Sequence, residues 1–241
     1  MTGRYTLKTI AHIRTEFPEK FGIPRQSGLV DALRAVIVFE EPYRSADALR
    51  GLEGYSHLWL IWQFSRSIRE DWSPTVRPPR LGGNTRMGVF ATRSPFRPNA
   101  LGLSAVRLER IEPHSPEGPL LIVRGADLMD QTPIFDIKPY LPFADSYPDA
   151  RGGFAAERFG HALTVQIADE LLERIPEARR ESALALLEQD PRPSYQNDPE
   201  RIYGLRYAGL ELRFRVAGDV LTVVEVEADC AQTSSADCVG P

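Results

Sequence analysis

The chain has 241 residues, of which 42% are hydrophobic and 26% charged, and its formal net charge is −4 at pH 7. This length can form one large domain or a large and a small one, and the composition is that of an ordinary globular protein. The sequence has no long apolar run and no signal-peptide pattern, so we expect a cytoplasmic protein without a membrane span. Its two cysteines both lie in the last dozen residues, so we expect neither a disulfide framework nor a metal site.

The positive charge is concentrated in one part of the chain. Between positions 66 and 110 there are nine arginines and only three acidic residues, a local excess of six positive charges. Because electrostatic attraction is screened within about 8 Å at physiological salt, a phosphate backbone responds to such a patch more than to the overall charge. The negative total therefore does not exclude a nucleic-acid partner.

The first two thirds of the chain predict mainly β-structure. Short runs rich in Val, Ile, Leu and aromatic residues are separated by turn-forming Gly, Pro, Asn and Asp, which favours a closed or nearly closed barrel. One early helix is predicted over residues 45–52, with Ser45 as its cap. The predicted strands span residues 5–14, 33–39, 57–64, 87–92, 101–111 and 120–125.

The pattern changes after the proline-rich residues 138–153. Apolar residues at helical spacing over 167–188 predict two helices, or one kinked helix, divided at Pro176. Alternation over 209–226 around Gly218-Asp219 predicts a hairpin. The fold class is thus α+β: a mainly β, barrel-like domain over residues 1–153, a small α+β domain over 154–230, and a disordered tail over 231–241.

Four stretches combine polar side chains with special backbone residues, whereas dinucleotide-binding, P-loop and metal-ligand spacings are absent from the sequence. In the second stretch, prolines hold two arginines beside Phe96, which favours a ligand site over a plain turn. In the third, we expect Asp127 or Asp130 to serve as a turn residue that bonds local backbone. The stretches are FGIPRQSGL at 21–29, RPPRLGGNTRMGVFATRSPFRPN at 77–99, DLMDQTPIFDIKPY at 127–140 and DPRPSY at 190–195.

Together with GLEGYSHLWL at 51–60, and in this order, these stretches resemble the TrmO (YaeB-like) family of tRNA threonylcarbamoyl-adenosine methyltransferases. The resemblance covers about residues 6–226. It implies a non-Rossmann β-barrel methyltransferase domain, a C-terminal domain that aids tRNA binding, and a homodimer. It also implies S-adenosylmethionine as cofactor, and methylation of the exocyclic nitrogen of threonylcarbamoyl-adenosine next to the anticodon of a threonine tRNA.

The resemblance also assigns a cofactor site. Relatives in the family carry His-Gln where this chain has Ser65-Arg66, which puts side-chain contacts at these two positions in question, although backbone contacts can persist. They carry Gly where this chain has Gln131, which indicates a positive φ at that position. The implied cofactor contacts are Pro24, Arg25, Gln26, Ser65, Arg66, Arg93, Leu103, Asp127, Asp130, Thr132 and Pro133.

Methyl transfer from a sulfonium requires alignment of the reacting atoms and exclusion of water. The accepting nitrogen lies between a purine and a carbamoyl group, so we expect its acidic proton to need only partial removal, by a carboxylate or through water. Asp127, Asp130 and Asp136 are the candidate catalytic carboxylates, with Tyr140 as a hydrogen-bonding alternative. An arginine fork suits the threonyl carboxylate, and other cations suit phosphates. The predicted substrate and tRNA contacts are Arg86, Arg97, Asn99, Lys138, Arg192 and Tyr195.

Two alternatives remain open at this point. A non-catalytic RNA-binding module would use the same basic face and would need no S-adenosylmethionine. A methyltransferase acting on a different acceptor would share the cofactor but not the modified adenosine.

Overall fold

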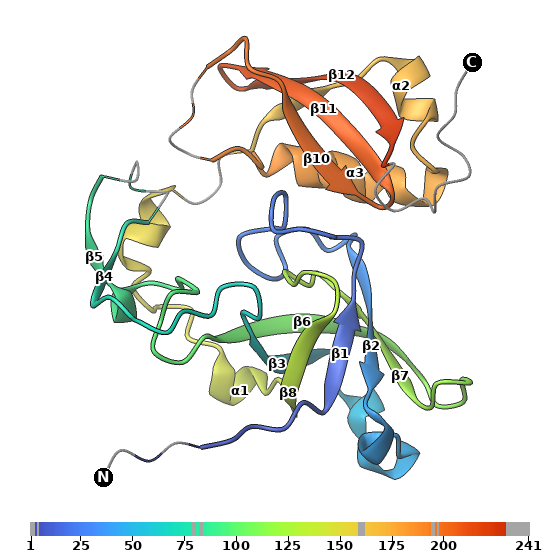
Figure 1. Cartoon of the computed structure of the whole chain (residues 1–241). Coiled ribbons are helices and arrows are strands. Elements are labelled where there is room, and N and C mark those ends of the chain that lie inside the picture. Colours follow the sequence, from blue (N-terminus) through green and yellow to red (C-terminus); the bar gives the residue numbers. More distant parts are fainter. Residues whose placement is uncertain are drawn as a thin grey trace.

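The computed structural model describes residues 3, 5–78, 81, 84–158, 162–193, 196 and 198–229. The predicted disordered tail and Tyr195 lie outside these residues. Within them, the strands form a barrel and a separate four-stranded sheet, and the second sheet lies over one end of the barrel (Figure 1).

The barrel is built entirely from antiparallel neighbours and is closed by pairing of its last strand in the chain with its first. Closure leaves no free sheet edge, which removes a surface prone to unwanted strand pairing. Around the barrel the order is β1 (Ala11–Arg14), β2 (Arg34–Phe39), β7 (Leu120–Arg124), β6 (Leu101–Glu112), β3 (His57–Gln63) and β8 (Thr132–Pro139).

Alternation along each strand fills the barrel interior. In β3, for example, Leu58, Leu60 and Trp62 are buried while the residues between them are more exposed, because successive side chains of a strand point to opposite faces. The barrel core also takes apolar residues from the other strands, including Ile13, Ile37, Val106, Leu121, Val123 and Ile134. The predicted barrel and the α+β class are confirmed.

Three predicted elements are shorter or different in the structure. The first strand begins at Ala11 rather than residue 5. The helix over 45–52 is replaced by two 3-10 turns separated by Gly51, whose φ of 89° ends the first turn, and Ser45 makes no capping hydrogen bond. Of residues 87–92, only β5 (Met87–Gly88) is a strand, paired with β4 (Thr75–Val76), and a 3-10 turn follows over Val89–Ala91.

Strand β8 was not predicted from the sequence, because prolines and charged residues interrupt its alternation. Pro133 is the second residue of the strand and Pro139 the last, the end positions at which a sheet tolerates proline most easily. The strand nevertheless closes the barrel, since it pairs with both β1 and β3. The third polar stretch is therefore part of the barrel wall.

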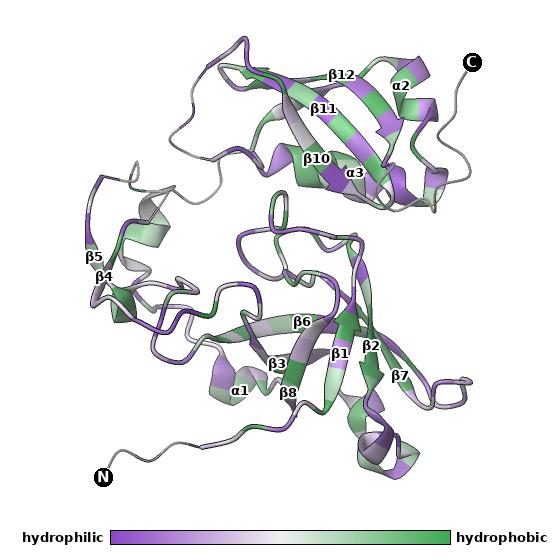
Figure 2. Cartoon of the chain, viewed as in Figure 1, coloured by the Kyte–Doolittle hydropathy of each residue, from purple (hydrophilic) through white to green (hydrophobic). Residues whose placement is uncertain are grey.

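The C-terminal unit is a sheet of order β10-β11-β12-β9 with two helices packed on it (Figure 1). Pro176 stands directly before the second helix, so the predicted division there is confirmed, as is the hairpin at Gly218. Figure 2 shows hydrophobic and hydrophilic residues alternating along the hairpin. The elements are β9 (Thr164–Gln166), α2 (Asp169–Glu173), α3 (Glu177–Glu188), β10 (Tyr203–Tyr207), β11 (Leu210–Ala217) and β12 (Val220–Ala228).

The core of this C-terminal unit includes residues from the barrel side. Phe17, Val30 and Leu33, from the loop between β1 and β2, pack with the sheet and α3, and the rings of Phe17 and Tyr207 lie 5.4 Å apart. An ion pair between Glu16 and Arg179 joins the same surfaces. This loop, which contains the first polar stretch, is thus held between the two units. No helix of the described ranges is long and apolar enough to cross a membrane.

Candidate functional site

A cavity of about 720 Å³ lies at the end of the barrel where β1, β3 and β7 end and β6 and β8 begin. Three of the four polar stretches, far apart in the sequence, meet around it. The implied cofactor residues that line it are Pro24, Arg25, Gln26, Ser65, Arg66, Arg93, Leu103, Asp127 and Thr132, and the predicted substrate residues that line it are Arg97 and Asn99.

Two of the implied cofactor residues do not line the cavity. The Asp130 carboxylate accepts hydrogen bonds from the Thr15 amide at 3.0 Å and from the Gln131 side chain at 3.3 Å, so it serves the turn before β8. Pro133 lies in β8 opposite His12. The φ of Gln131 is 59°, which confirms the positive φ expected at this position.

A buried hydrogen-bond chain supports the Asp127 carboxylate at the cavity. Trp62 Nε1 donates to Ser104 Oγ at 2.9 Å, and Ser104 Oγ donates to Asp127 Oδ1 at 2.6 Å. Because the indole donor occupies an acceptor position of the hydroxyl, the hydroxyl proton is directed to the carboxylate. Sequence reasoning missed Trp62 and Ser104. The available signal was Ser104, a polar residue within an otherwise apolar stretch of the predicted strand over residues 101–111.

Burial dominates the electrostatics of this carboxylate. It raises the pKa of Asp127 above the ordinary aspartate value, while the Ser104 hydrogen bond, backbone amides including that of Ser27, and the charge of Arg93 act in the opposite direction. Among the described residues that line the cavity, Asp127 is the only carboxylate. A desolvated carboxylate in a cavity is a common feature of functional sites.

Gly102 allows the Trp62 indole to pack directly against the backbone of β6. A Cβ built at position 102 would lie 2.2 Å from Trp62 Cε2, so no other residue fits there without a shift. The Trp62 ring also meets the Phe64 ring edge-on, with centroids 4.3 Å apart. On the other face of β6, Leu101 and Leu103 are exposed and line the cavity.

Several cations at the rim donate to uncharged oxygens. Arg93 donates to the Gln26 side chain, and Arg97 Nη1 donates to the Thr92 carbonyl at 2.9 Å. Lys20 Nζ donates to the Arg66 carbonyl at 2.6 Å. These bonds fix the positions of the charged groups without neutralising them, so the rim keeps a positive potential suited to anionic ligands.

A larger cleft of about 2270 Å³ adjoins the cavity and extends between the β4–β5 pair and the C-terminal unit. Its only acidic lining residues in the described part of the chain are Asp71 and Asp190. Three of the predicted tRNA contacts line it: Arg86 is exposed, Arg97 is half-buried and Arg192 is buried. Its basic lining residues are Lys20, Arg25, Arg69, Arg77, Arg86, Arg93, Arg97, Arg151 and Arg192.

Arg192 differs from the other cations of the cleft. It is buried, and its guanidinium donates to both oxygens of Asp190, at 2.8 and 3.0 Å. Its carbonyl accepts a hydrogen bond from Arg25 at 3.2 Å. Arg192 therefore fixes the contact between the two units, and its charge is already balanced by a carboxylate.

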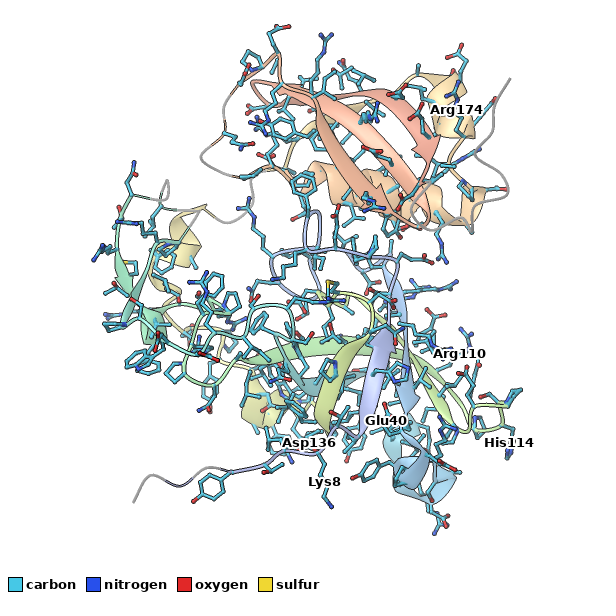
Figure 3. The ribbon with its side chains drawn as sticks, in the orientation of Figure 1. Lys8, Glu40, Arg110, His114, Asp136 and Arg174 are labelled. Atoms are coloured by element: carbon cyan, nitrogen blue, oxygen red, sulfur yellow. The ribbon has the colours of Figure 1, made fainter. Side chains whose placement is uncertain are left out.

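Asp136, Lys138 and Tyr140 line neither the cavity nor the cleft. Asp136 Oδ2 and Lys138 Nζ form an ion pair at 2.9 Å, and Figure 3 shows Asp136 on the side of the barrel away from the C-terminal unit. Tyr140 packs against the ring of Trp59, with centroids 5.5 Å apart. Within one chain, the structure does not bring these three residues to the cavity.

In the described ranges, no cluster of three or more His, Cys, Asp or Glu residues is arranged to hold a metal ion. The chemistry available at the cavity therefore rests on one half-buried carboxylate, a fixed cationic rim, exposed aromatic and aliphatic groups, and the backbone of several loops.

Comparisons with known proteins cover almost the whole chain. The tRNA-methyltransferase O N-terminal domain matches residues 12–146, and the TrmO C-terminal domain matches residues 160–229. The tRNA (adenine(37)-N6)-methyltransferase of Escherichia coli is 42% identical over 92% of this chain and 98% of its own length. The enzyme of the same name from Eikenella corrodens is 50% identical over 67% of this chain and 91% of its own length. The crystal structure of TrmO from Pseudomonas aeruginosa has a TM-score of 0.75 at 34% identity, and the match covers 94% of this chain and 100% of that one.

Proposed function

The chain belongs to the tRNA-methyltransferase O (TrmO) family, and from this premise we propose that it methylates the N6 nitrogen of adenosine 37 in tRNA with S-adenosylmethionine. We propose further that the accepting base is threonylcarbamoyl-adenosine in a threonine tRNA. The observation that carries the proposal is the cavity itself: three polar stretches meet around the half-buried Asp127 carboxylate beside a cleft rich in arginine.

The residues of the cavity fit S-adenosylmethionine. A volume of about 720 Å³ lies within the range of pockets that bind small ligands and cofactors, roughly 300–1,000 Å³. Apolar and aromatic side chains suit an adenine ring, and Arg93 suits the carboxylate of the amino-acid part. Pro24, Gln26, Arg93, Leu103 and Thr132 would hold the cofactor, which supplies an electrophilic methyl group on a sulfonium when bound.

Asp127 takes the catalytic role in this proposal, in place of Asp136 or Tyr140. The burial that raises its pKa also makes its carboxylate a stronger proton acceptor than an exposed aspartate. Ser104 fixes the orientation of the carboxylate, and since each carboxylate oxygen can accept more than one hydrogen bond, it can still accept one from the nitrogen that is methylated. Leu101 and Leu103 limit water at the reacting atoms, and the Arg97 fork pairs with the threonyl carboxylate.

The test is methyl transfer from labelled S-adenosylmethionine to threonine tRNA with and without the threonylcarbamoyl group. We expect label only on the modified tRNA, and a loss of roughly 100-fold or more in kcat for Asp127→Asn. Asp136→Asn is the matched control, because the same change is made outside the cavity, and it should retain activity. Label on tRNA without the threonylcarbamoyl group would refute the substrate assignment.

The remaining alternative is a tRNA-binding module without catalysis. It predicts tRNA binding but no heat and no thermal shift with S-adenosylmethionine alone, so calorimetry with the cofactor separates it from the enzyme. We also propose a cytoplasmic homodimer. Sedimentation of the full chain tests the dimer, and a monomer at micromolar concentration would contradict it.

A further inference from the structure

Three aromatic side chains in the wall of the larger cleft are exposed to an unusual degree. The exposed fractions are 53% for Trp72, 73% for Phe90 and 38% for Phe96. The rings of Trp72 and Phe90 lie 6.2 Å apart at an interplanar angle of 32°, and the Arg69 guanidinium lies 3.8 Å above the Phe96 ring. Single exposed aromatic residues need no explanation, but a cluster in one cleft indicates a binding surface.

This surface is held firmly by the backbone. Phe90 belongs to the 3-10 turn after β5, and its neighbour Val89 is buried and donates its amide to the Pro74 carbonyl at 2.9 Å. Phe90 therefore projects from a fixed point, and it lines both the cavity and the cleft. A group stacked on Phe90 would lie at the junction of the two.

The charge of the cleft identifies the class of partner. Its described lining has nine basic residues and two acidic ones, and Asp190 is already paired with Arg192. A protein partner of ordinary composition would leave much of this charge buried and uncompensated. Arginines interleaved with exposed aromatic faces are instead the arrangement that binds unpaired nucleotides, because phosphates meet the cations while bases stack on the rings.

We propose that Trp72 and Phe90 form a stacking platform for an unpaired RNA base next to the methylated nucleotide, and that the Arg69–Phe96 pair extends this platform along the cleft. This inference rests on the proposed function, since it names the part of the protein that receives the bases flanking the target. Within a folded anticodon loop such bases are already unpaired, so their stacking faces are available without melting a helix.

Affinity for an anticodon stem-loop RNA, measured by fluorescence anisotropy without cofactor, tests the platform. Alanine replacement of a stacking aromatic costs about 5- to 150-fold in affinity, and we expect that loss for Phe90→Ala and Trp72→Ala. Phe90→Leu, which keeps an apolar side chain but removes the π-face, should lose nearly as much, whereas Phe90→Trp should bind as the unsubstituted protein does. Phe143→Ala is the control, because Phe143 is 87% exposed but lines neither the cavity nor the cleft.

A blunt RNA duplex provides the second comparison. Because its bases are already stacked, Phe90→Ala should leave duplex affinity unchanged, and quenching of Trp72 fluorescence should appear with the stem-loop but not with the duplex. Trp72→Phe should abolish this quenching, which would show that the signal comes from Trp72 and not from Trp59 or Trp62. Trp72 lines only the larger cleft, so Trp72→Ala should keep its affinity for S-adenosylmethionine.

Two outcomes would overturn the platform. Stem-loop affinity unchanged in Phe90→Leu and Trp72→Ala would show that the π-faces are not used. A change of sedimentation from dimer to monomer in these variants would show that the surface joins two copies of the chain. Because binding is measured without methyl transfer, an inactive protein with Phe90-dependent stem-loop binding would leave the platform intact and refute only the catalytic proposal.

Discussion

Replacement of Gly102 by alanine should damage both the stability of the barrel and the geometry of the Asp127 site. The added Cβ would lie 2.2 to 2.6 Å from three atoms of the Trp62 ring. The indole is rigid and almost fully buried, so it cannot relieve the overlap by a change within the side chain. To relieve the overlap, Trp62 must leave its position, and its hydrogen bond to Ser104 is then lost.

The magnitude follows from these two effects. Overpacking a well-packed core costs roughly 1–3 kcal/mol, and the lost hydrogen bond adds about 0.5–1.5 kcal/mol. The lower chain entropy of alanine in the unfolded state returns roughly 0.5–1 kcal/mol. We therefore expect a decrease of about 2 kcal/mol in the unfolding free energy, together with weaker cofactor binding, because Ser104 no longer has a fixed orientation toward Asp127.

Urea unfolding and calorimetry with S-adenosylmethionine measure the two effects. Gly54→Ala is the matched control, since a Cβ there meets nothing within 4 Å, and it should change the unfolding free energy by less than about 0.5 kcal/mol. In a Trp62→Ala background, Gly102→Ala should cost little, because the overlapping ring is gone. The same cost in both backgrounds would refute the steric explanation.

Three further predictions concern a pKa, a backbone angle and a charge. Because burial raises the pKa of Asp127, the folded chain holds this proton more tightly than the unfolded chain. The unfolding free energy therefore decreases as the pH rises from the ordinary aspartate pKa through the raised pKa of Asp127. The thermal midpoint of Asp127→Asn relative to the unsubstituted protein should therefore rise as the pH increases above the ordinary aspartate pKa, and a difference that stays constant with pH would contradict this. Gln131→Val should lower the unfolding free energy by about 1–2 kcal/mol, because a β-branched residue is strained at a φ of 59°. Urea titration checks it, with Gln131→Gly expected to be tolerated, and equal stability of both variants would be evidence against strain. Arg86→Ala should weaken tRNA binding and reduce the salt dependence of log K by about 1, measured by titration at several salt concentrations, since Arg86 is exposed in the cleft. An unchanged slope would exclude a phosphate contact.

The sequence was most informative where structure depends on local features. Alternation and turn residues predicted five of the barrel strands, and Pro176 and Gly218 marked a helix start and a hairpin turn at the observed positions. These features are read from neighbouring residues, so they hold before the chain folds. Strand β8 was not predicted, because its prolines and charged residues interrupt the alternation. Only its pairing with β1 and β3 defines it as a strand.

The sequence by itself determined that polar stretches, arginines and a barrel occur together in this protein, and three of the four polar stretches that it singled out line the cavity. Only the tertiary structure decided which carboxylate lies at the cavity: Asp127 lines it, whereas Asp136 pairs with Lys138 elsewhere. It also showed that Gly102 and Ser104, rather than their leucine neighbours, face the barrel interior. The physical reason is that the buried face of a strand, and the partner of a charge, depend on residues far away in the sequence, which come together only when the barrel closes.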